Sequence, residues 1–255
     1  MTSFPAILRS EWTKIRTVRS TLWTLALTFV VTVGIGALLS LLTNNNFAEF
    51  RQHDTNPFDA TGTAFSGIVL GELAIIVFGV LAIGNEYSSG MIRLTLAAVP
   101  QRATLLAGKT VVLGALALAV SVVTAFVTFF AGQALLGSHS TTIGEPNVLR
   151  AVFGAALYLT MLCLFSAGVT TMLHNQTLAL GVLVPFFFLL SPILSAVPKV
   201  KTLAHYFPDY AGSRMTLVYE QHGQPYGPWA GFLICLAWTA AALVGGALVL
   251  KRRDA

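Results

Sequence analysis

The chain has 255 residues, of which 55% are hydrophobic and only 10% are charged, and its mean hydropathy is +0.76. Soluble domains carry about 25% charged residues, so this composition excludes an ordinary soluble fold and indicates an integral membrane protein. The net charge of +5 is weak evidence for nucleic-acid binding, because the basic residues stand at the ends of apolar runs, as membrane topology requires.

Residues 1–20 predict an amphipathic helix that lies at the membrane surface. Apolar residues recur there at spacings of three and four, and the basic residues fall mostly on other sides of the helix. Such helices lie in the headgroup plane and are attracted to anionic lipid. Two roles stay open: a basic anchor beside the first span, and a lever on the cytoplasmic face that touches a partner. The residues assigned to this surface are Trp12, Lys14, Arg16 and Arg19.

Six apolar runs follow, each long enough to cross about 30 Å of hydrocarbon, which takes about 20 residues. They cover about 21–42, 62–83, 110–136, 151–173, 178–197 and 229–250. We therefore predict an all-α integral membrane protein with six transmembrane helices in a single domain over 1–255. Pro185 and Pro192 interrupt the fifth run, so a kinked helix is expected there.

The Lys and Arg residues between these runs predict the orientation. The segments on the side of the N-terminus hold ten of them, and the segments on the other side hold five. Cytoplasmic segments are enriched in Lys and Arg, so both termini and segment 84–109 are predicted to be cytoplasmic, in the plasma membrane. Segment 198–228 is then the longest outer loop.

Segment 84–109 is too polar to be a span. Ser88 or Ser89 is expected to cap a new helix, and Glu86 stands where the positive end of that helix favours an acid. Residues 91–99 predict a short, mostly apolar helix that a proline ends. A helix of this kind either sinks into the membrane interface or fits a groove on a soluble partner.

Inside the predicted spans, one acid and several small residues stand out. Glu72 lies near the middle of the second run, where a charged side chain costs about 2.5–3.5 kcal/mol, so it should face the bundle interior or a wet cavity. A hydrogen bond between helices is the alternative role. Gly67 with Gly71, and Gly36 with Ser40, have the spacing that lets helices approach closely. The five histidines are expected to be solvated, because no pair has metal-ligand spacing.

Three motifs resemble the permeases of ABC type-2 transporters, notably those of actinobacteria. The stretch EYSSGMIR, followed by LAAVPQR, resembles the cytoplasmic loop of that family. SEWTKIRTVRSTLWT (10–24) resembles the N-terminal connecting helix, and YFPDYAGSRM (206–215) the outer segment between the last two spans. The resemblance implies that segment 84–109 forms a coupling helix that docks on an ATP-binding subunit. The coupling residues that it implies are Glu86, Tyr87, Ser88, Gly90, Met91, Arg93 and Arg102.

The resemblance also implies a function, namely export of a hydrophobic or amphiphilic compound through a pathway built by two permease chains, identical or related. No GxxxxGK[ST] stretch is present, so ATP and Mg²⁺ are expected on a separate ATPase subunit and no cofactor, catalytic residue or metal site on this chain. Glu72, Phe186, Phe187 and Phe188 are the candidate pathway residues. Two alternatives stay open: a multi-span membrane enzyme acting on lipid-linked substrates, and a non-transporting scaffold or sensor subunit.

Overall fold

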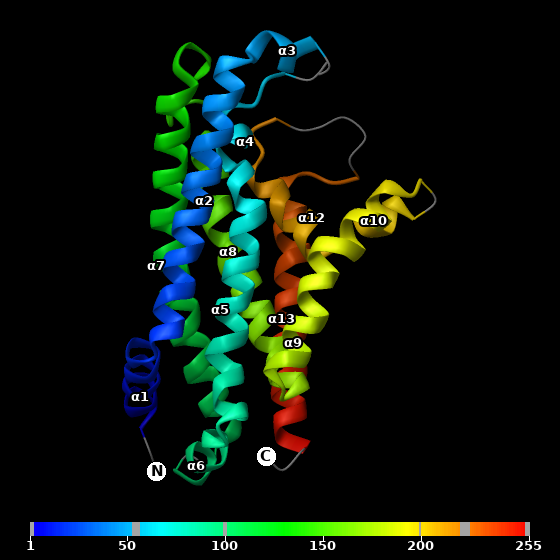
Figure 1. Ribbon diagram of the computed structural model, residues 1–255. Helices are drawn as coiled ribbons and strands as arrows, with labels where there is room; N and C mark the ends of the chain where they lie inside the picture. Colours follow the sequence, from blue (N-terminus) through cyan, green and yellow to red (C-terminus); the bar gives the residue numbers. More distant parts are fainter. Residues whose placement is uncertain (1–2, 53–56, 99–100, 199, 220–224, 253–255) are drawn as a thin grey trace.

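The computed structural model describes residues 3–52, 57–98, 101–198, 200–219 and 225–252 (Figure 1). The side chains of residues 50–52, 93, 96 and 98 also fall outside the described part. Within it, all regular structure is helical. The α-helices are α1 (Phe4–Thr17), α2 (Arg19–Asn45), α3 (Phe47–Gln52), α4 (Ala60–Ala64), α5 (Ile68–Ser88), α6 (Met91–Ala98), α7 (Arg102–Leu136), α8 (Val148–Leu173), α9 (Gln176–Pro185), α10 (Ser191–Ala196), α11 (Lys201–Ala204), α12 (Pro208–Ser213) and α13 (Pro228–Arg252).

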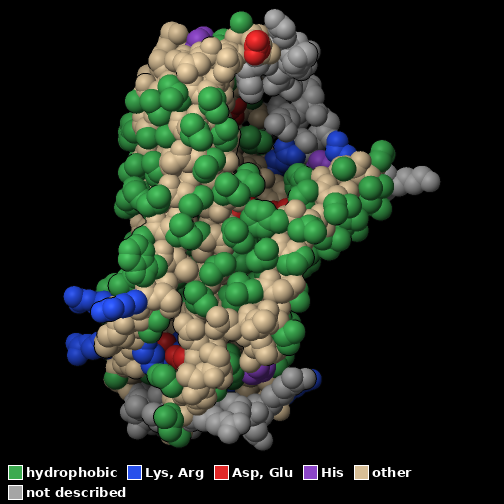
Figure 2. Space-filling view, in the orientation of Figure 1, with side chains coloured by type: hydrophobic (Ala, Val, Ile, Leu, Met, Phe, Trp, Pro, Cys, Tyr) green, Lys and Arg blue, Asp and Glu red, His purple; other side chains and the backbone are tan. Residues whose placement is uncertain are grey.

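Six helical stretches are long and apolar enough to cross a membrane, which confirms the all-α, six-span prediction for the described residues. They are Arg19–Asn45, Ala60–Ser88, Arg102–His139, Val148–Leu173, Gln176–Ala196 and Pro228–Arg252. Apolar side chains cover much of the visible face, and Lys and Arg side chains project beside α1 (Figure 2). Helices α1 and α6 and the last turn of α13 share one end of the bundle, called here the terminal end (Figure 1).

Helix α8 lies at the centre of the bundle and contacts α5, α7, α9 and α13. Its sequence is apolar on every side, as expected for a helix that neighbours surround. Tyr158, Leu159, Leu162 and Cys163 are fully buried along it. The other buried cysteine, Cys235 of α13, is also a free thiol, which agrees with the reading of both as small apolar residues.

Close packing joins α2 to the start of the second span through small residues. A Cβ atom added at Gly67 would lie 2.2 Å from the Thr32 carbonyl oxygen, and one at Gly36 would lie 2.3 Å from that of Ala64. One at Gly71 would lie 2.0 Å from the Thr32 hydroxyl. Such distances leave no space for a side chain, so the close approach that the spacing predicts is present.

The fifth span is broken where its prolines predict. Helix α9 ends at Pro185, a π-helix spans Phe186–Leu190, and α10 then points away from the other spans (Figure 1). Side-chain hydrogen bonds tie α10 to α12: the Ser191 hydroxyl donates to the Asp209 carboxylate, and the Tyr210 hydroxyl donates to Ser195 at 2.7 Å. The expected kink is therefore a change of helix type.

The connector after the fifth span is only partly an outer loop. Helix α12 packs on α13 and α8, and Gly212 lies so close to the Tyr158 ring that an added Cβ would be 2.2 Å from it. Asp59 ties this region to the start of α4, because its carboxylate accepts from the amides of Gly62 at 2.8 Å and Val218 at 2.9 Å. The predicted outer loop thus contributes to the core.

Candidate functional site

Four charged side chains from three helices meet inside the terminal end. Lys109 of α7 donates to Glu11 Oε2 of α1 at 2.8 Å and forms a short hydrogen bond to Glu86 Oε1 of α5. Lys14 of α1 donates to Glu11 Oε1 at 2.8 Å and to Glu86 Oε1 at 3.0 Å. We call these four residues the charge cluster. It joins the N-terminal helix to two transmembrane helices.

Because the charge cluster is buried, its ion pairs affect the stability of the fold. Glu11, Glu86 and Lys109 are 4–7% exposed, and ions so buried are tolerated only when they are paired. Lys14 is more open, with 26% of its side chain exposed. Burial lowers the pKa of Lys14, but hydrogen bonds and charges from Glu11 and Glu86 outweigh this and raise it above its ordinary value. Lys14 is therefore fully charged at neutral pH.

The turn between α5 and α6 differs from its sequence prediction. The hydroxyls of Ser88 and Ser89 both donate to the Asn85 carbonyl, at 3.2 and 2.6 Å, so these serines close α5 and do not cap α6. Gly90 makes the turn with φ of 69°, a left-handed conformation that glycine adopts without strain. Glu86 accordingly lies on the last turn of α5, and its carboxylate pairs inside the bundle instead of facing the start of α6.

Helix α6 presents apolar side chains to the outside of the terminal end. Leu94 is 75% exposed and Met91 46%, and Ala97 is exposed on the same face, whereas Ile92 is buried. A contiguous exposed apolar patch is typical of a surface that contacts a protein or a membrane. The side chain of Arg93, one of the predicted coupling residues, lies outside the described part of the structure. We call Met91, Leu94 and Ala97 the α6 face.

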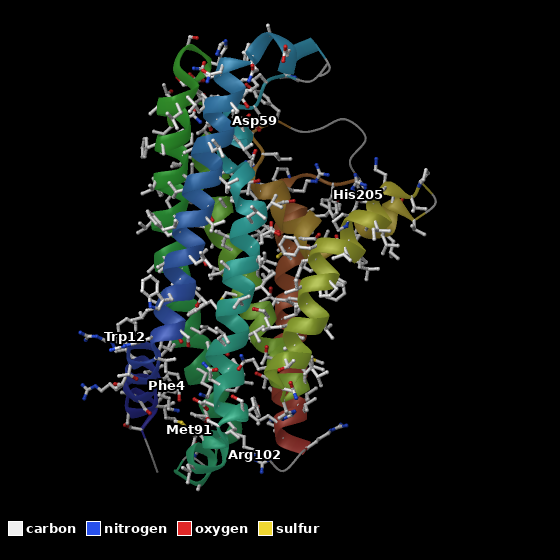
Figure 3. All side chains as sticks on the ribbon, in the orientation of Figure 1. Phe4, Trp12, Asp59, Met91, Arg102 and His205 are labelled. Carbon is white, nitrogen blue, oxygen red and sulfur yellow. The ribbon has the colours of Figure 1, made fainter. Side chains whose placement is uncertain are left out.

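Two further predicted coupling residues, Tyr87 and Arg102, make contacts within the terminal end. Tyr87 packs edge-on against His174, with ring centroids 4.8 Å apart. Arg102 opens α7 and donates to the carbonyl oxygen of Leu250 at 2.8 Å, which ties α7 to the last turn of α13. Phe4, Trp12, Met91 and Arg102 all lie at this end, and Asp59 lies at the opposite end (Figure 3).

The side of α1 that faces the bundle includes a charged residue. Ile7 and Glu11 face the bundle, and Ile7 packs with Leu105 of α7. Trp12 is 49% exposed, and Arg16 and Arg19 are exposed beyond it. Trp12 therefore lies away from the buried side of α1 and is accessible to a membrane surface. Lys14, by contrast, points into the charge cluster. The membrane-surface role of Trp12, Arg16 and Arg19 stays a prediction.

Glu72 is buried in the bundle interior, as predicted for an acid within a span. The Tyr158 hydroxyl of α8 donates to Glu72 Oε1 at 2.7 Å. This contact is the hydrogen bond between helices that the sequence left as the alternative to a cavity role. A role in the pathway stays a prediction.

We expect Tyr158→Phe and Glu72→Leu, which remove the donor and the acceptor respectively, each to lower the stability of the solubilised protein by about 1 kcal/mol, because a side-chain hydrogen bond between transmembrane helices contributes roughly 0.6–1.7 kcal/mol. Thermal unfolding in detergent measures the change, with the exposed Tyr219→Phe as the matched control. Strictly additive losses in the double variant would show that the two groups do not interact energetically.

The three phenylalanines of the fifth span do not share one face. Phe187 is 4% exposed and packs edge-on against Phe165 at 6.0 Å, whereas Phe186 and Phe188 are only partly buried. Phe187 therefore offers no surface to a passing molecule in this conformation. His205 is also buried, at 5% exposure, so the expectation that it is solvated is wrong. His53 and His222 lie outside the described residues.

Sequence reasoning missed two members of the charge cluster, Glu11 and Lys109. Each stood four positions after a buried apolar residue, Ile7 in one case and Leu105 in the other, and therefore on the same helix face. That spacing was the available signal. In the part of the chain that the structure describes, no group of three His, Cys, Asp or Glu side chains is placed to hold a metal ion.

Comparison with known families gives one match that spans nearly the whole chain. The profile of the family described as "ABC-2 family transporter protein" matches residues 6–255. A comparison with curated proteins found no match. The matched range includes the charge cluster, the α6 face and all six candidate spans.

Proposed function

The chain belongs to the ABC-2 family of transporter proteins, and from that membership we propose that it is the membrane permease subunit of an ATP-binding-cassette transporter. It is a multi-pass membrane component and not a catalytic enzyme. In this proposal two permease chains form the pathway, and a separate subunit binds ATP and Mg²⁺ and hydrolyses the ATP. The cargo is a hydrophobic or amphiphilic compound, which the transporter exports across the plasma membrane.

The terminal end is the cytoplasmic end in this proposal. Arg9, Arg16 and Arg19 are exposed there, together with Lys251 and Arg252 at the end of α13. Cytoplasmic flanks of spans are enriched in such residues. An ATPase subunit in the cytoplasm would therefore meet α1, α6 and the end of α13.

The observation that carries the docking proposal is the α6 face. Helix α6 is short and carries the apolar groups of this face at positions i, i+3 and i+6. A helix of this form binds by laying its apolar side into a groove of the partner. Glu86 pairs inside the bundle, so we assign it to the response of the permease and not to direct contact with the ATPase. The α6 face is the contact surface.

Leu94→Glu should abolish or reduce at least tenfold the recovery of the ATP-binding-cassette subunit with the affinity-tagged permease, because it places a charge at the centre of an apolar contact. Co-purification from detergent after coexpression with that subunit measures the effect. Leu203→Glu is the matched control, since Leu203 is also exposed, at 61%, but lies on α11 away from the terminal end.

The same experiment tests the function as a whole. A well-folded, solubilised permease that never retains an ATP-binding-cassette subunit contradicts the proposal. Retention by the parent chain and by Leu203→Glu, with loss in Leu94→Glu, supports both the partner and the docking surface. Retention in all three chains supports the partner and moves its contact away from Leu94.

The pathway residues complete the proposal. Glu72 supplies a polar point within the second span, and the partly buried rings of Phe186 and Phe188 supply apolar surface beside the break in the fifth span. Broken helices often line transport pathways, because their irregular backbone needs a protein or water-lined environment. An amphiphilic cargo fits this combination of one polar and several aromatic groups.

A further inference from the structure

Lys14 and Lys109 bind the same two carboxylates, but in different surroundings. Lys109 is enclosed, with 8% of its side chain exposed, and among the described residues its ammonium pairs with Glu11 and Glu86. Lys14 has 26% of its side chain exposed, and its ammonium also approaches the Thr95 hydroxyl of α6 at 3.5 Å. Lys14 is therefore the member of the cluster that contacts α1, α5 and α6 together.

Lys14 also has room to move. A cavity of about 530 Å³ is lined by all four members of the cluster together with Met91, and Lys14 is the lysine with more of its side chain exposed, 26% against 8% for Lys109. A lysine ammonium on a flexible four-carbon stem can change partners within such a space. Glu11 and Glu86 keep Lys109 as a partner when it does so, and no carboxylate is then left without a cation.

A displacement of α6 can be transmitted to Lys14 in two ways. One is direct, through Thr95. The other passes through the backbone, because Glu86 stands four residues before Gly90, where the chain turns into α6. Both routes end on the ammonium that also binds Glu11 of α1.

We propose that Lys14 is a positioning residue that makes α1 follow a displacement of α6, whereas Lys109 holds the cluster together in every state. The proposal rests on the proposed function, because the displacement of α6 comes from an ATPase subunit. It assigns different roles to two lysines that share the same acids. Removal of Lys14 should then uncouple α1 from the nucleotide state without preventing assembly.

Pulsed electron paramagnetic resonance on the complex with the ATP-binding-cassette subunit, in nanodiscs, tests this assignment. Spin labels at Thr13→Cys on α1 and Lys251→Cys on α13 report the position of α1, and both sites are exposed. Cys163 and Cys235 are fully buried and stay unlabelled. The distance distribution is compared between the nucleotide-free complex and the complex trapped with ATP and vanadate.

In the parent chain, trapping is expected to shift the distance between the labels. Lys14→Met should abolish that shift while ATP hydrolysis by the complex continues, and Lys14→Arg should restore at least part of it. Arg9→Met removes a positive charge from the exposed side of α1 and should leave the shift unchanged. Thr95→Val removes only the hydroxyl on α6 and should reduce the shift, which provides a second test if Lys14→Met fails to fold.

An unchanged shift in Lys14→Met, or no shift in the parent complex, would overturn the assignment. Failure of the parent chain to form any complex would instead overturn the proposed function. A shift abolished equally by Arg9→Met and Lys14→Met would make the effect one of total charge on α1 and would also remove the specific role of Lys14.

Discussion

Lys109→Met is expected to lower the free energy of unfolding by about 3–5 kcal/mol, since it removes one partner from a buried set of ion pairs. Lys109 is 7% exposed and binds both Glu11 and Glu86, which are equally buried. Without it, two carboxylates share Lys14 alone, and one oxygen of Glu86 already lacks a hydrogen-bond partner. Unfolding of the solubilised protein by heat or denaturant measures the loss.

A second substitution separates the loss of charge balance from the loss of packing. Glu86→Gln removes one of the acids that Lys109 neutralises, so the double variant Lys109→Met/Glu86→Gln should be more stable than Lys109→Met alone. The exposed Lys201→Met, at the other side of the molecule, is the control and should unfold like the parent. A Lys109→Met protein as stable as the parent would mean that the charge cluster contributes nothing to folding.

Gly67→Ala is expected to destabilise the protein by about 1–3 kcal/mol, the usual cost of overpacking a tight contact. The added methyl group would lie 2.2 Å from the Thr32 carbonyl oxygen and 2.6 Å from the Gly36 nitrogen. Both are backbone atoms of α2, so no side chain can rotate to make space, and the whole helix has to shift. Thermal unfolding in detergent measures this change.

Gly34→Ala gives the matched comparison, on α2 but outside its contact with the second span. Gly34 lies on the exposed side of α2, and an added Cβ would meet nothing within 4 Å. Alanine favours a helix over glycine by about 0.8–1.0 kcal/mol, so this variant should be as stable as the parent or slightly more stable. Equal losses at Gly34 and Gly67 would show that the close approach of α2 to the second span is absent in the membrane protein.

The spans could be predicted from the sequence because hydropathy is a local property. Each of the six apolar runs overlaps a helix that the structure contains, and the glycine spacing in the first two spans predicts close helix packing at these residues. The two prolines likewise located the break in the fifth span. In each case the physical cause acts within one or two helical turns of the residue.

The charge cluster could not be predicted in the same way, because its partners are far apart in the chain. Lys109 and Glu11 are separated by 98 positions, and Glu86 and Lys14 by 72. The positive-inside rule accounts for a lysine at either place without requiring that it be buried. The sequence predicts Glu86 beside the positive end of the following helix, whereas its neighbours in space turn it inward to pair with Lys109. Its role in coupling stays a prediction.

The π-helix in the fifth span makes the count of residues as important as their identity. A π-helical turn accommodates an additional residue relative to an α-helix, and each residue of an α-helix advances the chain by about 100°. Deletion of one residue within Phe186–Leu190 would allow a regular α-helix and leave α10 facing nearly the same way, whereas a further residue inserted after this stretch would turn α10 by about that angle. Ser191 and Ser195 would then no longer face Asp209 and Tyr210. Which side of α10 faces α12 thus depends on the number of residues before it, and a single-residue insertion there would change this more than most substitutions.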